Sequence, residues 1–141
     1  MTKRILIMGL PGAGKTTLAE KLREKLDAYN KKTVWVNADR IREEYNDWDF
    51  SEAGRVRQSN RMRELADRLD SDYAIADFVC PLSEMREIFD ANYLVWVDTI
   101  TEGRYNDTNK IFVPPDQYDF RVTEQNAEKW STIIAEKIKN D

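Results

Sequence analysis

A phosphate-binding loop is the clearest chemical feature near the start of the chain. The pattern G-x-x-x-x-G-K-[ST] is matched by Gly9-Leu10-Pro11-Gly12-Ala13-Gly14-Lys15-Thr16-Thr17. Glycines let such a loop curl so that successive backbone N–H groups point at phosphate oxygens. We expect Lys15 to neutralise the terminal phosphates and Thr16 to offer its hydroxyl to Mg²⁺. The loop therefore predicts a site for ATP or another nucleoside triphosphate.

The segments on either side of the loop support this prediction. Residues 4–8 form a short apolar run, which is typical of a buried parallel strand. After the loop, Leu18, Leu22 and Leu26 recur at helical spacing and predict one buried stripe of a helix over 17–26. A strand, a loop and a helix in this order place the positive end of the helix at the phosphates.

Composition limits the chemistry that the chain can perform. With 141 residues, 41% of them hydrophobic and 34% charged, the chain predicts one soluble globular domain over 1–141, with no membrane span and no signal peptide. Its single cysteine, Cys80, excludes an internal disulfide and fits a reducing cytoplasm. A net charge of −4 argues against broad binding to nucleic acid. Because histidine is absent, a general base has to be a carboxylate.

Alternating strands and helices predict an α/β fold with a parallel sheet of about five strands. We expect the later strands at 33–36, 73–79, 93–98 and 120–122. Helices are expected to begin at Arg40, to run from the N-cap Ser51 to about Leu69, and to run from about Thr123 to Lys139. The helix after Ser51 should bury Met62, Leu65, Ala66 and Leu69. The polar segment 99–115 is expected to be a loop.

Three aspartates lie at expected strand ends, where a parallel sheet places its ligand site. Asp39 is favoured as the catalytic base because Arg40 and Arg42 follow it and can hold an anionic acceptor. Asp77 ends an apolar run as a Walker B aspartate does and is expected to hold Mg²⁺ through water. Asp98 is expected to be structural. Aspartates also favour strand ends and helix caps for structural reasons, and this reading stays open for each of them.

Arginine and phenylalanine side chains supply candidate contacts for an acceptor. The helix after Ser51 is rich in arginine, and most of these side chains are expected to form solvated ion pairs. Arg55 and Arg61, near its start, are expected to face the cleft. Phe50 and Phe112 are apolar residues in polar stretches, so each is expected either to stack on a base or to be a small core residue.

Over most of its length the chain resembles the adenylylsulfate kinases, which use ATP to phosphorylate the 3′-hydroxyl of adenosine 5′-phosphosulfate. Val36-Asn37-Ala38-Asp39-Arg40-Ile41-Arg42 is similar to the family's acidic strand end followed by Ile-Arg. Asp49-Phe50-Ser51-Glu52 with Arg55-Val56 resembles its Gly-Phe-Ser stretch, and Trp96-Val97-Asp98-Thr99 its Phe-Val-Asp-Thr strand. Phe78-Val79-Cys80-Pro81 resembles its loop over the acceptor, and Lys110-Ile111-Phe112 its Lys-x-Phe segment.

The resemblance implies a P-loop kinase of the three-layer α/β/α type, with ATP and Mg²⁺ as cofactors and a role in sulfate assimilation. It implies that Asp39 is the catalytic base, which adds to the catalytic role of Lys15 and the metal role of Thr16 expected from the phosphate-binding loop and the metal role of Asp77 expected from its strand. The substrate-binding residues that it implies are Asp39, Arg42, Phe50, Arg55, Gln58, Arg61, Phe78, Val79, Cys80, Lys110 and Phe112. Among these, Phe50 and Phe112 would enclose one adenine between two rings.

The chain also departs from the family. The family's longer, basic lid is reduced to Thr99–Asn109, within a lid region of about 99–118, and Arg104–Asn109 has no counterpart. Cys80 replaces a serine, Asp77 a small residue and Ala38 a glycine. Two rival functions therefore stay open: a kinase for another nucleotide, a nucleoside or a nucleic-acid hydroxyl, and a non-enzymatic nucleotide-binding module. The oligomeric state also stays open, a homodimer included.

Overall fold

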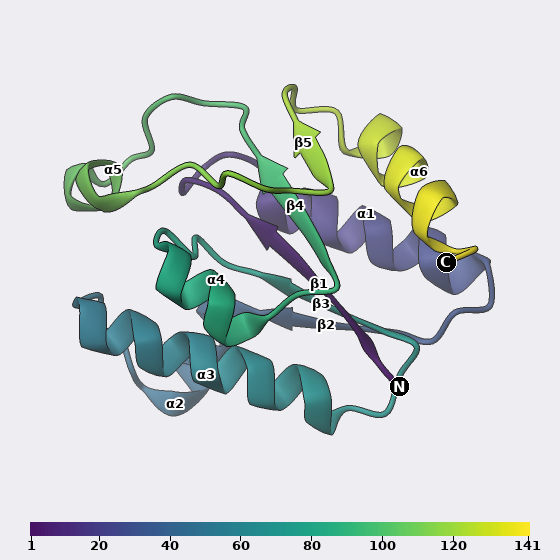
Figure 1. The fold of residues 1–141 in the computed structure, drawn as a ribbon, viewed down its shortest axis with the longest axis horizontal. Helices are drawn as coiled ribbons and strands as arrows, with labels where there is room; N and C mark the ends of the chain where they lie inside the picture. The colour runs from purple at the N-terminus through teal and green to yellow at the C-terminus, as the bar shows by residue number, and fades with distance from the viewer.

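The computed structural model describes residues 1–141 and contains one parallel sheet of five strands in the order β2-β3-β1-β4-β5 (Figure 1). The strands are β1 (Lys3–Met8), β2 (Thr33–Asn37), β3 (Tyr73–Asp77), β4 (Tyr93–Val97) and β5 (Phe120–Val122). The helices are α1 (Lys15–Ala28), α2 (Ala38–Tyr45), α3 (Glu52–Arg68), α4 (Ser83–Phe89), α5 (Asn106–Ile111) and α6 (Ala127–Ile138). None of the helices is both long and apolar enough to cross a membrane.

Two apolar layers hold the helices against opposite faces of the sheet. Successive residues of β1 point to opposite faces, so Ile5 and Ile7 pack with α1 and α6. Leu6 and Met8 pack in a second core with residues of α2, α3 and α4. All four β1 side chains are fully buried, as expected for the central strand of a covered parallel sheet. The predicted three-layer α/β/α architecture with five strands is therefore confirmed.

Element boundaries differ from the prediction at several points. The predicted loop 99–115 contains α5, and α4 was not predicted. The strand predicted over 73–79 ends at Asp77 because the chain turns at Cys80, whose φ is +48°. The last helix begins four residues later than predicted, at Ala127, because the Asn126 side chain caps it by accepting from the backbone N–H of Lys129. Leu69, predicted to be buried, is exposed beyond the end of α3.

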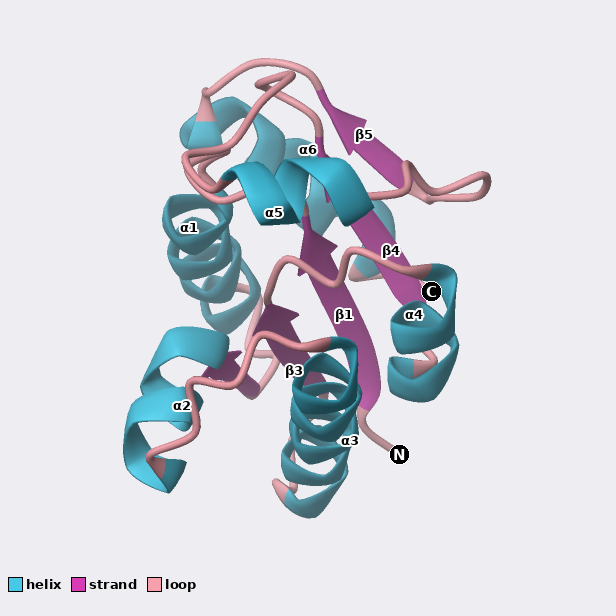
Figure 2. Cartoon of the chain, turned by 90° about the vertical axis from the view of Figure 1, so that its left-hand side faces the viewer, coloured by secondary structure: helices cyan, strands magenta, loops and turns pink.

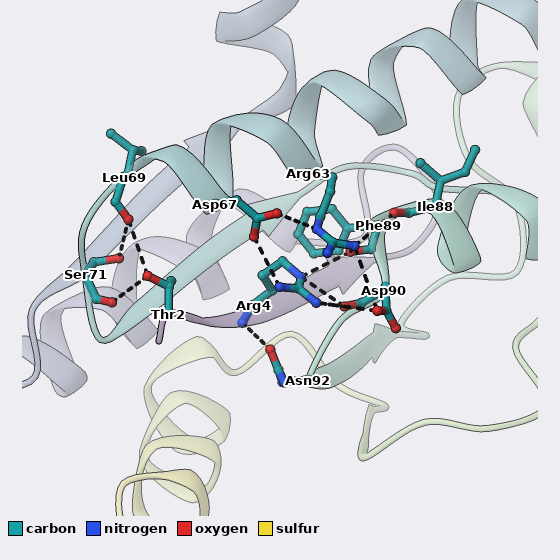
Figure 3. Close-up of polar contacts among 10 residues, drawn as sticks. All are labelled: Thr2, Arg4, Arg63, Asp67, Leu69, Ser71, Ile88, Phe89, Asp90 and Asn92. Carbon is teal, nitrogen blue, oxygen red and sulfur yellow. Dashed lines mark hydrogen bonds and ion pairs between the residues drawn. The ribbon is translucent and has the colours of Figure 1, made fainter.

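Arg4, near the start of β1, ties the helices of one face to the sheet (Figure 3). Its guanidinium donates to a carboxylate oxygen of Asp67 in α3 at 3.2 Å and to the carbonyl oxygen of Asp90, which caps α4, at 3.0 Å. The Arg4 backbone N–H donates to the Asn92 side chain at 2.8 Å. Because the Arg4 side chain is only 13% exposed, these charge-assisted bonds are partly shielded from water. They fix the amino-terminal end of the sheet.

Replacing Arg4 with alanine is expected to lower the free energy of unfolding by about 1–3 kcal/mol, because the largely buried guanidinium joins α3 and the end of α4 to the sheet through charge-assisted hydrogen bonds. Urea unfolding of both proteins measures this change. Arg68→Ala is the matched control, because Arg68 pairs with Glu64 on an exposed surface of α3 and should change the unfolding free energy by less than about 0.5 kcal/mol. Equal losses in both variants would contradict the clamping role of Arg4.

Candidate functional site

The phosphate-binding loop follows β1 and opens onto the carboxyl ends of the strands. Gly9 needs to lack a side chain, because a Cβ there would clash with the carbonyl oxygen of Val97 in β4. Gly14 precedes α1 in a left-handed conformation, with φ +105°, and no side chain caps the helix. The first N–H groups of α1 are therefore free to bind an anion.

Contacts from outside the loop hold it in this shape. The Thr99 hydroxyl donates to the carbonyl oxygen of Ala13 at 2.6 Å, and the Gln125 amide donates to the carbonyl oxygens of Gly12 and Ala13 at 3.3 Å. These residues follow β4 and β5, the two strands on one side of β1. The loop is thus positioned before any ligand binds, which lowers the entropy that binding has to overcome.

Asp77 lies at the end of β3, beside Thr16. Its carboxylate accepts from the Thr16 hydroxyl at 3.0 Å, from the Trp35 indole at 2.8 Å and from the Asn37 amide at 3.2 Å. Only 3% of Asp77 is exposed, and this burial raises its pKa, against the opposing effect of the three donors and of the Lys15 charge. A hydroxyl and a carboxylate in contact are oxygen ligands of the kind that Mg²⁺ prefers.

Lys15 lies at the start of α1 and donates from Nζ to the carbonyl oxygen of Leu10 at 3.0 Å. Burial, with a smaller contribution from the charge of Arg104, lowers the pKa of Lys15 to about 8, against the opposing effect of the Asp77 and Asp39 charges. The negative charge around the ammonium group is therefore too small to offset the cost of burying it.

A cavity of about 650 Å³ joins the phosphate-binding loop to α2, α3 and the segment around α5. In Figure 2, α5 lies across the end of β1, above this edge of the sheet. The loop residues lining the cavity are Pro11, Gly12, Gly14, Lys15, Thr16 and Thr17. The other predicted site residues that line it are Asp39, Arg42, Phe50, Arg55, Gln58, Asp77, Phe78, Val79 and Cys80. One cavity therefore brings together most of the residues that the sequence singled out.

Two arginines on the α2–α3 side are buried without a carboxylate partner. Arg42 is 5% exposed and donates to the carbonyl oxygens of Asp47 and Asp49 at 3.1 and 3.2 Å. Arg55 is 7% exposed and donates to the Phe50 carbonyl oxygen at 2.9 Å and to the Thr108 hydroxyl at 3.2 Å. Burial lowers the pKa of both guanidinium groups. Both guanidiniums also lie against the Phe50 ring, at 4.3 and 5.3 Å from its centroid.

Asp39 is exposed in the first turn of α2 and reaches the same cavity. The helix begins there because the Asn37 side chain accepts from the backbone N–H of Arg40 at 3.0 Å. The same Asn37 side chain donates to Asp77, so α2 is joined to the carboxylate beside the phosphate-binding loop. Gln58, 2% exposed, also ties α3 to the start of α2 by donating to the Ala38 carbonyl oxygen at 3.1 Å.

Three predicted substrate-binding residues do not line the cavity. Arg61 is engaged by Asp47 at 3.0 Å and by Gln58 at 2.8 Å, and Lys110 is exposed on α5. Phe112 packs against the second core beneath Arg86, whose guanidinium lies 5.6 Å from the ring centroid. The structure therefore does not place Phe112 opposite Phe50, because α5 turns its ring toward the core.

Asp98, expected to be structural, forms an ion pair with Arg121 of β5 and does not line the cavity.

Sequence reasoning missed several residues that line the cavity. They are Ser59 of α3, Met85 of α4, Trp48 in the loop before α3 and, around α5, Arg104, Tyr105, Asp107 and Thr108. The alternation of Trp48 and Phe50 in a polar stretch was a usable signal, because neither side chain has an apolar neighbour in sequence. The α5 residues carried no such signal, since a six-residue helix is too short to show a period.

Comparisons with known proteins agree with this geometry. The model of the adenylylsulphate kinase family matches residues 1–102. The chain is 31% identical over 88 residues to the cytidine diphosphoramidate kinase of Campylobacter jejuni, an alignment that covers 62% of this chain and 51% of that protein. It is 36% identical over 86 residues to the adenylyl-sulfate kinase of Burkholderia ambifaria, covering 58% and 47%. The matched stretch spans about half the length of these curated relatives.

The fold also matches a solved structure. The APS kinase of Mycobacterium tuberculosis in complex with AMPPNP and APS superimposes with a TM-score of 0.82 over 98% of each chain, at 20% sequence identity. At this level of identity, the likeness establishes the P-loop kinase fold.

The lowered pKa of Lys15 predicts how ATP binding depends on pH. Below pH about 8 the ligand-free protein carries a charged Lys15, whereas above it a proton has to be taken up for the ammonium to face a phosphate. We expect the association constant for ATP to be steady up to about pH 8 and then to fall by up to roughly tenfold per pH unit. Calorimetric titration measures this profile.

Lys15→Arg is the control for this prediction, because a guanidinium stays charged throughout the range. A fall near pH 8 that persists in Lys15→Arg would contradict the assignment of this titration to Lys15.

Proposed function

The chain belongs to the adenylylsulphate kinase family, whose model matches residues 1–102, and on this premise we propose that it transfers the terminal phosphate of ATP to the 3′-hydroxyl of adenosine 5′-phosphosulfate. One observation carries the acceptor part of this proposal. Arg42 and Arg55 are buried cations without carboxylate partners, in the cavity that also contains the phosphate-binding loop. A buried charge of this kind is stabilised when an anionic ligand supplies the missing partner.

ATP would lie with its phosphates on the loop from Gly9 to Thr17. Lys15 would neutralise charge that moves onto the oxygen bridging the β- and γ-phosphates, where stabilisation of the transition state is most effective. Thr16 and Asp77 would hold Mg²⁺, whose chemistry is to neutralise phosphate charge. Phosphoryl transfer depends mainly on positioning and charge neutralisation, which these residues can provide in a short chain.

The acceptor would lie between α2, α3 and Asp77–Pro81. Its 5′-anionic group would bind Arg42 and Arg55, its base would stack on Phe50, and Asp39 would accept the proton of the attacking hydroxyl. Asp39 fits this role because it lies in the cavity and because the chain contains no histidine.

Cytidine diphosphoramidate is the second candidate acceptor. The 31% identity to the Campylobacter jejuni kinase supports it, and so does the position of Phe112, which leaves adenine without the second ring that the family resemblance implies. Both candidates are nucleotides with a modified 5′-phosphate group, and Arg42 and Arg55 can bind the anionic part of either.

Phosphoryl transfer from radiolabelled ATP to a panel of acceptors tests the proposal. The panel contains adenosine 5′-phosphosulfate, cytidine diphosphoramidate, nucleoside monophosphates and an oligonucleotide, with an acceptor-free reaction as control. We expect adenosine 5′-phosphosulfate to have the highest kcat/KM. A higher kcat/KM for another member of the panel would identify that compound as the acceptor. ATP binding without transfer to any member would favour a non-enzymatic nucleotide-binding module.

Asp39→Asn is expected to lower kcat by a factor on the order of 10²–10⁴, the usual contribution of a positioned general base, while ATP affinity stays nearly unchanged. Asp77→Asn is the informative companion, because loss of a carboxylate beside Thr16 should raise the Mg²⁺ concentration needed for half-maximal rate. If Asp77→Asn removed turnover and Asp39→Asn had little effect, the two roles would have to be exchanged.

Phe50→Ala and Phe112→Ala are expected to separate base stacking from core packing. Phe50→Ala should raise the KM of the acceptor by roughly tenfold to hundredfold without a matching change for ATP. Phe112→Ala should instead lower the melting temperature and affect neither substrate selectively, because its ring packs in the second core. If Phe112→Ala instead raised the KM of the acceptor without a matching change for ATP, Phe112 would have to be reassigned as the second ring around the base.

A further inference from the structure

Two large aromatic side chains lie about half exposed at the edge of the cavity. Trp48 and Phe50 come from the loop between α2 and α3, and both line the cavity. Their ring centroids are 6.5 Å apart, and the ring planes are inclined at 44°. Single exposed apolar side chains are common, but two neighbouring rings at a cavity suited to an anionic nucleotide form a surface that a flat ligand can cover.

The loop that carries Trp48 is held firmly on both sides of it. Arg42 donates to the carbonyl oxygens of Asp47 and Asp49, the residues that flank Trp48, at 3.1 and 3.2 Å. The backbone N–H of Asp49 donates to the Asp47 carboxylate at 3.2 Å, and Arg57 donates to that carboxylate at 2.8 Å. Hydrogen bonds from Arg57 hold the pKa of Asp47 well below its usual range. Trp48 is therefore presented by an ordered loop.

Phe112 is not free to serve as the second ring. Its ring packs against the second core and lies below the Arg86 guanidinium, which also donates to the Cys80 carbonyl oxygen at 3.0 Å. The next residue, Val113, is fixed through its backbone N–H, which donates to the Pro81 carbonyl oxygen at 2.8 Å. Moving Phe112 into the cavity would disrupt these contacts, whereas Trp48 already lines it.

We propose that Trp48, together with Phe50, forms the surface that binds the base of the nucleotide acceptor and that Trp48 contributes to the selectivity among bases. The inference rests on the proposed function in one respect, that the acceptor is a nucleotide. Because the two rings are inclined at 44°, a base that stacks on the face of one ring also contacts the other ring at an angle, so both rings bury part of its apolar surface. The guanidiniums of Arg42 and Arg55 against Phe50 place the cations for the acceptor's anionic group beside the same surface.

The test measures binding of AMP, CMP and ribose 5-phosphate to the full chain, with saturating AMPPNP and Mg²⁺ filling the ATP site. Trp48→Ala is expected to weaken binding of whichever nucleotide binds more tightly by roughly tenfold to hundredfold and to leave the affinity for ribose 5-phosphate unchanged. Trp48→Phe, which keeps a ring, should restore most of the affinity. Tyr45→Ala is the matched control, because Tyr45 is equally exposed in α2 but does not line the cavity.

Nucleotide affinity unchanged in Trp48→Ala would overturn the inference. Equal losses for nucleotide and ribose 5-phosphate would also overturn it, because Trp48 would then only shape the pocket. Failure of the proposed kinase function would give a different result. In that case no acceptor in the panel would be phosphorylated, yet Trp48→Ala would still selectively weaken nucleotide binding. Conversely, active transfer with an acceptor KM that does not change in Trp48→Ala leaves the kinase function intact and removes the role of Trp48.

Discussion

The buried carboxylate of Asp77 connects the parts of the molecule that have to act together. It accepts from Thr16, the neighbour of Lys15, and from Asn37, which caps the helix that presents Asp39. Parallel pairing makes this arrangement possible, because the register places Asp77 beside Asn37 in β2 and Ile7 in β1. Loss of the carboxylate would leave several donors without a partner, and an unpaired buried donor costs more than one good hydrogen bond contributes. The phosphate side and the hydroxyl side of the cavity thus share one anchor.

Positive charge accumulates in the cavity without enough negative charge to balance it. Burial lowers the pKa of Lys15, Arg42 and Arg55, which means that each cation disfavours the compact state by itself. A phosphate or another anion that binds in the cavity offsets this cost of charge burial, and it does so only in the folded protein. The folded state is therefore expected to gain stability from its ligands through mass action. The same electrostatic imbalance that weakens the empty protein favours the binding of anionic substrates.

Much of the site follows from rules that act over short stretches of sequence. The phosphate-binding loop has a fixed pattern, and parallel strands place Asp39 and Asp77 at the same edge of the sheet. The cap formed by Ser51 was also predictable, and its side chain accepts from the backbone N–H of Gly54 as expected.

The features that were missed depend on contacts distant in sequence. Helices α4 and α5 have seven and six residues, too few for a periodic pattern, so their existence is decided by tertiary packing. The direction of Phe112 follows from α5 and from Arg86, neither of which a local pattern specifies. Trp48 is positioned by hydrogen bonds from Arg42 to the backbone on either side of it. No local sequence pattern predicts these bonds.

The strand order has a consequence for how the chain acquires its structure during synthesis. Among these five strands β1 comes first in the sequence and lies in the centre of the sheet, and its two partners, β3 and β4, follow much later in the sequence. The second strand, β2, pairs only with β3. No native strand pair can therefore be complete until the chain has been synthesised as far as Asp77, the end of β3. Until then the apolar residues of β1 have no strand to pair with, and unpaired strands are prone to aggregation.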